Sequence, residues 1–112
     1  MSFDDRLAGR VRELLGRRRN VEERRMFGGL AFLLDAKMFC GVLGRDLVVR
    51  VGPERHAAAL ARPHVRPMDF TGRPMTGYVY VSPKGTATAR TLQSWVRMAE
   101  EFVATLPVKR RG

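Results

Sequence analysis

The side chains that could do chemistry are few in this sequence, and their spacing joins none of them into a known site. Cys40 is the only cysteine, and His56 and His64 are the only histidines among the 112 residues. No carboxylate or further histidine is spaced to join either histidine on a helix face, so the sequence holds no zinc-binding pattern. We interpret both histidines as solvent-facing residues, and we predict no metal and no cofactor.

Cys40 would need a neighbouring base to act as a nucleophile. It alternates with Met38 and Val42 inside an apolar segment, and free cysteines are among the residues most often buried in proteins. We therefore favour a packing role for this thiol.

The carboxylates offer no obvious acid/base pair. Asp35 and Asp46 fall in predicted hairpin turns, where aspartate bonds to local backbone. Asp69 is different, because it lies among Met, Phe and Pro in segment 63–77 and is expected to be partly buried. We predict no catalytic residues and no enzymatic activity, with one alternative: a small enzyme or ligand-binding protein that uses segment 63–77 as a lid over Asp69. The glutamates in charged stretches, expected to be solvated, are Glu22, Glu23, Glu100 and Glu101.

Positive charge is the strongest compositional feature. The chain has 21 Lys and Arg against 11 Asp and Glu, a net charge of +10. Its densest part lies between the predicted first helix and the sheet, and a basic tail joins it if the terminal helices lie side by side. We call this group the basic cluster; it contains Arg17, Arg18, Arg19, Arg24, Arg25, Lys109, Arg110 and Arg111.

The basic cluster has two interpretations. Contacts with phosphates would give nucleic-acid binding that weakens steeply with salt. Alternatively, the charge only keeps the protein soluble, or reflects a GC-rich genome. Aromatic residues interleaved with the charge would favour base stacking, but they are lacking here. The aromatic residues that fall in apolar patterns instead are Phe27, Phe32, Phe39 and Trp95.

The methionines also have two interpretations. They could line an adaptable groove for a partner helix, but methionine more often fills gaps in a core, which is the role we favour. The residues concerned are Met26, Met38, Met68 and Met75.

The pattern of apolar residues predicts an antiparallel meander at 30–34, 38–43 and 47–51. Turn-forming residues at 35–37 and 44–46 separate its three strands. In the third strand, alternation predicts one buried side. Gly28 and Gly29, just before the sheet, indicate a bulge or a close approach to backbone, and no phosphate-binding loop is present.

Helical spacing predicts a first helix that starts at a Ser2 cap and ends near Gly16, and a last helix at 88–106. Segment 21–25 is expected to be a connection or a turn of helix. A short second helix is predicted at 53–62. Segment 63–77 is predicted to be an irregular loop with at most a brief strand at 68–70, followed by a fourth strand at 78–81.

This order predicts an α+β fold: a two-layer sandwich with an antiparallel sheet of about four or five strands and helices on one face. One domain spans 1–112, with a basic tail at 107–112. The absence of a secretion signal or an apolar span, together with the single cysteine, predicts a cytoplasmic protein with no membrane contact. A homodimer through an edge strand or the terminal helices is compatible with so small a domain.

Two motifs carry a family resemblance. The first is the sequence RMFGGLAF at 25–32, followed by KMFCGV at 37–42 and LVVRVG at 47–52; the second is RPMDFTGRPM at 66–75, followed by GYVYV at 77–81. Together they resemble the N-terminal domain of the TfoX/Sxy family over roughly residues 4–106. The residues that match the motifs include Met26, Phe27, Gly28, Gly29, Met38, Phe39, Pro67 and Met68.

The resemblance implies a two-layer α/β fold of the kind seen in type III secretion chaperones. It also implies a bacterial regulator of competence (DNA-uptake) genes, acting in concert with the cyclic-AMP receptor protein, with no established enzymatic activity. Full-length regulators carry a second, C-terminal helical domain. This sequence stops after the predicted last helix and a basic tail, so we expect a stand-alone N-terminal domain. We expect the motif residues Gly28, Gly29, Met38 and Phe39 to be turn and core residues.

The leading hypothesis is a non-enzymatic regulatory or adaptor domain that contacts a protein partner, such as a transcription factor. The alternatives are direct, weakly specific nucleic-acid binding through the basic cluster, and the ligand-binding protein or enzyme described above.

Overall fold

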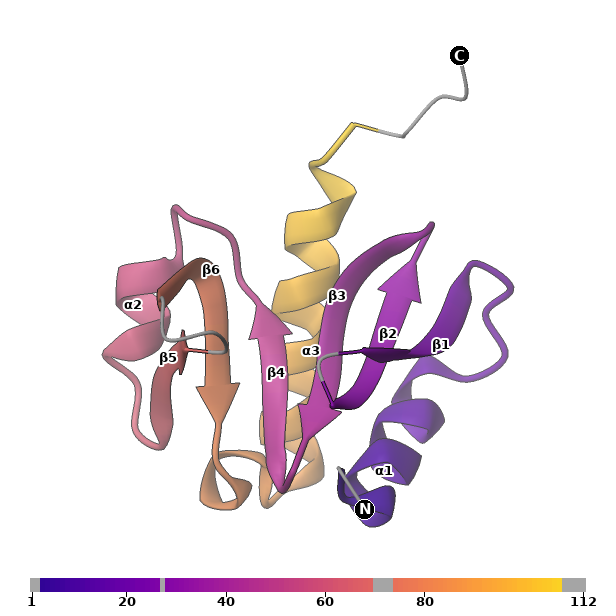
Figure 1. Ribbon diagram of the computed structural model, residues 1–112, viewed down its shortest axis with the longest axis horizontal. Helices are drawn as coiled ribbons and strands as arrows, with labels where there is room; N and C mark the ends of the chain where they lie inside the picture. Colours follow the sequence, from indigo (N-terminus) through magenta and orange to yellow (C-terminus); the bar gives the residue numbers. More distant parts are fainter. Residues whose placement is uncertain (1–2, 27, 70–73, 108–112) are drawn as a thin grey trace.

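The computed structural model describes residues 3–26, 28–69 and 74–107 (Figure 1). Within these ranges, the elements in chain order are α1 (Asp5–Leu15), β1 (Val21–Met26), β2 (Gly29–Leu34), β3 (Lys37–Leu43), β4 (Asp46–Arg50), α2 (His56–Leu60), β5 (Val65–Asp69), β6 (Pro74–Val81), a 3-10 turn (Pro83–Thr86) and α3 (Ala89–Ala104).

The strands form one six-stranded sheet in the order β1-β2-β3-β4-β6-β5, and all neighbours are antiparallel. The predicted meander is confirmed as β2, β3 and β4. The α+β class is confirmed as well, with six strands in place of four or five. The last helix is confirmed as α3, where Thr88 and Thr91 form a capping box.

Strand β1 corrects the expectation of a connection or helical turn at 21–25. All six of its residues pair with β2, from Val21 opposite Leu34 to Met26 opposite Gly29. Because β1 is an edge strand and nearly all of it is exposed, its residues show no apolar alternation. The pairing with an apolar neighbour, rather than any pattern of its own, makes this segment a strand.

Segment 63–77 is likewise not an irregular loop. Strand β5 pairs with β6 from Val65 opposite Val81 to Asp69 opposite Pro74. Pro67 is tolerated in β5 because an edge strand leaves half of its N–H groups outside the ladder. The neighbouring helix α2 is shorter than predicted.

The N-cap of helix α1 lies two residues later than expected. Asp4 is the N-cap: its carboxylate accepts the backbone N–H groups of Arg6 (2.9 Å) and Leu7 (3.3 Å). The predicted cap, Ser2, lies outside the described residues.

The core lies between one face of the sheet and the helices. A row of opposed residues crosses five strands, and α1 and α3 pack against it. Figure 1 shows α3 running behind β3 and β4. The row consists of Leu30, Val42, Leu47, Val81 and Val65, and the helices add Leu7, Val11, Leu15, Leu92, Trp95, Val96, Ala99 and Val103.

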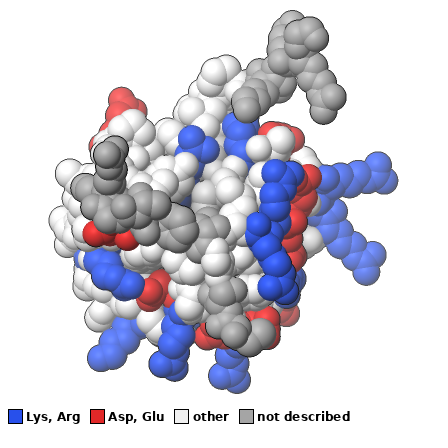
Figure 2. Space-filling model, in the orientation of Figure 1, with Lys and Arg blue, Asp and Glu red and all other residues white. Residues whose placement is uncertain are grey.

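The other face of the sheet carries the row Ala31, Gly41, Val48, Tyr80 and Arg66. Val48 is fully buried there, so the expectation of one buried side for this strand is wrong. Its neighbours explain the burial, because Tyr80 lies beside it and carries the Arg66 guanidinium 4.8 Å from its ring centroid. Figure 2 shows this face with uncharged residues at its centre and Lys and Arg side chains at its borders.

Where the chain leaves β4 towards α2, its backbone passes close to that of Gly77 in β6; we call this point the crossing. The Gly77 carbonyl accepts the N–H groups of both Val51 (2.8 Å) and Gly52 (3.1 Å). Gly52 has φ +86°, and a Cβ on this residue would overlap the ring of Phe102 in α3. The crossing therefore requires glycine at position 52 for two independent reasons.

We expect Gly52→Ala to lower the free energy of unfolding by about 2–4 kcal/mol, because it adds backbone strain and a clash with Phe102. Urea unfolding, followed by the fluorescence of the buried Trp95, measures this loss. Gly9→Ala is the matched control, because a Cβ at this helical position meets nothing within 4 Å. We expect it to raise the free energy of unfolding by about 0.5–1 kcal/mol. A Gly52→Ala protein as stable as the parent would contradict the account of the crossing.

Candidate functional site

Cys40 is fully buried in the core, opposite Phe32 on one side and Val49 on the other. Burial raises the pKa of its thiol, because a thiolate in the core loses its water, and the negative charge of Glu100 raises it further. The thiol therefore packs as a small apolar group.

The two histidines occupy different surroundings. His56 is half-buried rather than solvent-facing, and its Nδ1 accepts the backbone N–H of Gly77 at 3.0 Å. This bond fixes the start of α2 against β6. His64 is exposed, and its carbonyl accepts the Ser82 backbone N–H at 2.9 Å. Over the part of the chain that the structure describes, no three His, Cys, Asp or Glu side chains gather in a way that could hold a metal.

Asp69 is exposed at the end of β5, so the expectation of partial burial is wrong. The reason is the hairpin: most of the segment expected to form a lid is paired β-sheet. Residues 70–73 of this segment lie outside the described residues.

The basic cluster is divided by the fold. Arg17, Arg18 and Arg19 are exposed in the α1–β1 connection, where Arg18 forms an ion pair with Glu100 of α3. Lys109, Arg110 and Arg111 lie outside the described residues.

Strand geometry separates the two remaining arginines of the cluster. Arg24 is opposite Ala31 and pairs with Glu22 at 2.6 Å, whereas Arg25 is opposite Leu30 and lies 5.5 Å from the ring centroid of Phe3. Since neighbouring residues of a strand point to opposite faces, Arg24 and Arg25 cannot share one surface.

The glycines of the first family motif form a turn. Gly28 has φ +78°, and Gly29 pairs with Met26 at the start of β2, so they close the β1–β2 hairpin. Met26 is exposed, and Phe27 lies outside the described residues.

The other motif residues are mainly packing residues. Phe39 and Met68 are buried, whereas Met38 is half-buried and Pro67 is exposed. The carbonyl of Met38 accepts an N–H of Arg50 at 3.2 Å. Among the methionines that the structure describes, only Met68 is buried; Met75 and Met98 are half-buried.

A hollow of about 310 Å³ lies where α1 ends beside β1. At its edge, the Arg12 guanidinium donates two hydrogen bonds, of 2.7 and 2.8 Å, to the Glu23 carboxylate. These bonds lower the pKa of Glu23. Its lining residues are Arg12, Leu15, Gly16, Arg18, Val21, Glu23 and Phe32.

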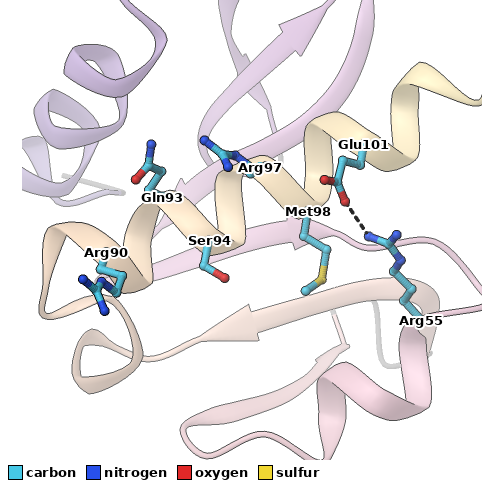
Figure 3. Close-up of a pocket in the computed structure, with 7 residues that line it drawn as sticks. All are labelled: Arg55, Arg90, Gln93, Ser94, Arg97, Met98 and Glu101. Carbon is cyan, nitrogen blue, oxygen red and sulfur yellow. Dashed lines mark hydrogen bonds and ion pairs between the residues drawn. The ribbon is translucent and has the colours of Figure 1, made fainter.

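The surface that sequence reasoning missed lies along α3. A hollow of about 330 Å³ lies along the exposed side of α3, beside Arg55 (Figure 3). A second hollow of about 170 Å³ adjoins it, since both are lined by Arg55 and Glu101. The seven-residue spacing of Arg90 and Arg97 in the predicted last helix indicates that they share one face of it. The sequence gives no sign that Arg55 lies beside that face. The larger hollow is lined by Arg55, Arg90, Gln93, Ser94, Arg97, Met98 and Glu101.

These features define a small α+β domain with charged hollows on its surface and its thiol sealed in the core. The chain belongs to the TfoX N-terminal domain family, whose pattern matches residues 13–103. Comparisons with curated proteins and with solved structures gave no significant match. Among the described residues, no helix has both the length and the apolar composition needed to cross a bilayer.

We expect Cys40 in the native protein to react with a thiol-specific reagent at least about 100-fold more slowly than in the unfolded protein, because both burial and the raised pKa suppress the thiolate. The absorbance of released thionitrobenzoate measures the rate with and without denaturant. Cys40→Ala supplies the blank. Equal rates in both conditions would show that the thiol is accessible.

We expect Glu23→Gln to destabilise the protein at pH 7 and to matter less at pH 3. A carboxylate whose pKa is lowered by folding adds stability above its unfolded pKa of about 4.3, and this contribution is lost as the pH falls through the folded value. Because the pair is exposed, the effect at pH 7 should be only about 0.2–1 kcal/mol.

Urea unfolding of Glu23→Gln, Arg12→Gln and the double variant at both pH values measures the coupling of this pair. Glu54→Gln, at an exposed position, is the control. A coupling energy of zero at pH 7 would contradict the stabilising role of the pair.

Proposed function

We propose that this chain is a regulatory or adaptor domain without catalytic activity. It acts by contact with a protein partner, such as a transcription factor, in the control of DNA-uptake genes. The observation that carries the proposal is the match of residues 13–103 to the TfoX N-terminal domain family.

The placement of the reactive side chains supports a role in contact rather than chemistry. Cys40 is sealed in the core, and His56 uses its Nδ1 to hold the backbone of Gly77. Arginines are the most numerous exposed charged side chains among the described residues, and they suit recognition of carboxylates or phosphates.

Deletion of the gene in its own bacterium, followed by measurement of DNA-uptake transcripts, tests the regulatory part of the proposal. We expect these transcripts to fall and to recover when the intact chain is supplied again. The contact part is tested by binding of the purified chain to the host's purified cyclic-AMP receptor protein and RNA polymerase. Unchanged transcripts together with no binding to either protein would overturn the proposal.

Direct nucleic-acid binding is a second candidate function. The observation that favours it is the run of three exposed arginines at 17–19, on a chain with a net charge of +10. Arg17 and Arg19 are the better positions to test, because Arg18 is engaged with Glu100.

Fluorescence anisotropy with duplex and single-stranded DNA, over a range of salt concentrations, tests this candidate. If the run binds phosphates, Arg17→Glu/Arg19→Glu should weaken binding by about tenfold or more and reduce the salt slope by about 2. Arg90→Glu/Arg97→Glu is the matched control, because it makes the same charge change on α3. Equal losses in both variants would mean that only net charge attracts DNA, and no binding would remove the candidate.

A further inference from the structure

The two adjoining hollows along α3 form one continuous groove, which we call the α3 groove. Both are lined by Arg55 and Glu101, whose side chains are bonded across the groove at 3.0 Å. In Figure 3, Ser94 and Met98 extend from α3 on the same side as Arg55, while Gln93 and Arg97 extend from the opposite side of the helix. The groove therefore runs along the exposed face of α3, with the β4–α2 connection on one side and Gln93 and Arg97 on the other.

The larger hollow is positively charged. It is lined by three arginines, Arg55, Arg90 and Arg97, and by one carboxylate, that of Glu101. Within the described residues, neither Arg90 nor Arg97 forms an ion pair. The bond between Arg55 and Glu101 is about half exposed at both ends, so it can exchange for another partner at little cost.

A fourth guanidinium lies against this part of α3, outside the lining of both hollows. Arg62, just after α2, lies 4.0 Å from the ring centroid of Trp95, the neighbour of Ser94 on α3. It is half-buried and has no carboxylate partner among the described residues. A partly desolvated cation beside a basic groove favours an anionic occupant.

The smaller hollow is more apolar. Beyond the Arg55–Glu101 pair it is lined by Val51, Pro53, Phe102 and Thr105, and by Glu54, which is exposed. A volume of about 170 Å³ is enough for one aliphatic side chain. The groove thus places an apolar recess at one end and a row of cations at the other.

We propose that the α3 groove binds an acidic peptide segment of a protein partner, anchored by one apolar side chain. The apolar residue enters the recess over Phe102, and carboxylates pair with Arg90 and Arg97. At the junction, a peptide carboxylate replaces Glu101 on Arg55. This inference rests on the proposed function, because it names the surface and the kind of partner for the protein contact proposed there.

The dimensions set the length of the segment. Twelve residues of α3 separate Arg90 from Phe102, which corresponds to about 18 Å along the helix axis. An extended peptide of about six residues covers that distance.

A peptide fits this groove better than a nucleic acid does. Guanidinium groups bind carboxylates and phosphates alike through two parallel hydrogen bonds, so stacking surfaces decide between the two ligands. Base stacking would need an open aromatic face, but Arg62 covers Trp95, and the Phe102 ring contacts Gly52 and lies 5.3 Å from the Arg50 guanidinium.

The test uses fluorescein-labelled hexapeptides with four Asp or Glu residues and one leucine, placed at either end because the direction of binding is open. Anisotropy with the full chain should show saturable binding of at least one of them. Replacing the leucine by serine should weaken binding by about tenfold, because the recess loses its apolar anchor. The amide version of the peptide, with Asn and Gln in place of the acids, should not bind.

Arg90→Glu/Arg97→Glu should weaken binding of the acidic peptide by about tenfold or more. Arg17→Glu/Arg19→Glu makes the same charge change on the α1–β1 connection and should have little effect. Circular dichroism and Trp95 fluorescence confirm that both variants are folded, as expected for exposed positions.

A second pair of variants looks for a gain rather than a loss. Glu101→Gln frees Arg55 and should tighten peptide binding by about threefold. Glu100→Gln removes the same charge from the adjacent position, where the carboxylate pairs with Arg18 instead, and should not tighten it. Equal effects of Glu101→Gln and Glu100→Gln, or unchanged binding in Arg90→Glu/Arg97→Glu, would overturn the proposal.

Three further outcomes have definite meanings. A single-stranded hexanucleotide that binds the groove more tightly than the peptides would overturn the proposal in favour of nucleic acid. If the intact chain binds a protein partner equally well with and without Arg90→Glu/Arg97→Glu, the proposed function stands and the α3 groove is wrong. If the peptides bind as predicted but gene deletion leaves DNA-uptake transcripts unchanged and no regulator binds, the groove stands and the proposed function fails.

Discussion

The antiparallel pairing of β4 with β6 is the contact on which the rest of the structure depends. It joins the amino-terminal meander to the carboxyl-terminal hairpin, and it continues the apolar row from Leu47 to Val81 across the sheet. The backbone N–H groups of Val51 and Gly52, just past the end of β4, both donate to the carbonyl of Gly77 in β6. The N–H of Gly77 in turn donates to Nδ1 of His56. These bonds fix where α2 begins, and with it the position of Arg55 opposite α3.

Sequence reasoning recovered the elements that carry their own pattern. The meander and α3 were predictable because apolar periodicity there matches the geometry of a strand or a helix. Strand β1 was not, since four of its six residues are charged and only its pairing with β2 makes it a strand. Strand β5 was hidden in the same way, because Pro67 and the prolines on either side of the strand indicate a loop until β6 is known to lie beside it.

The charged surfaces, like strands β1 and β5, depend on contacts between segments that the sequence pattern does not reveal. Closeness in sequence suggested one basic cluster, but the alternation of a strand sends Arg24 and Arg25 to opposite faces. The α3 groove was invisible in the sequence because it joins Arg55 to residues more than thirty positions later in the chain. Charge in this molecule is therefore organised by the ion pairs that link separate elements: α1 with β1, the α1–β1 connection with α3, and Arg55 with α3.

The two edge strands of the sheet, β1 and β5, carry residues that oppose the addition of further strands at high protein concentration. An open sheet offers backbone hydrogen-bonding groups at both edges, and flat apolar edges invite aggregation. Here β1 presents charged residues at one edge, and β5 presents Pro67, which has no N–H to donate, at the other. Further strands are thus disfavoured by desolvation of charge at one edge and by a missing donor at the other, so the sheet resists growth into fibrils despite its apolar interior.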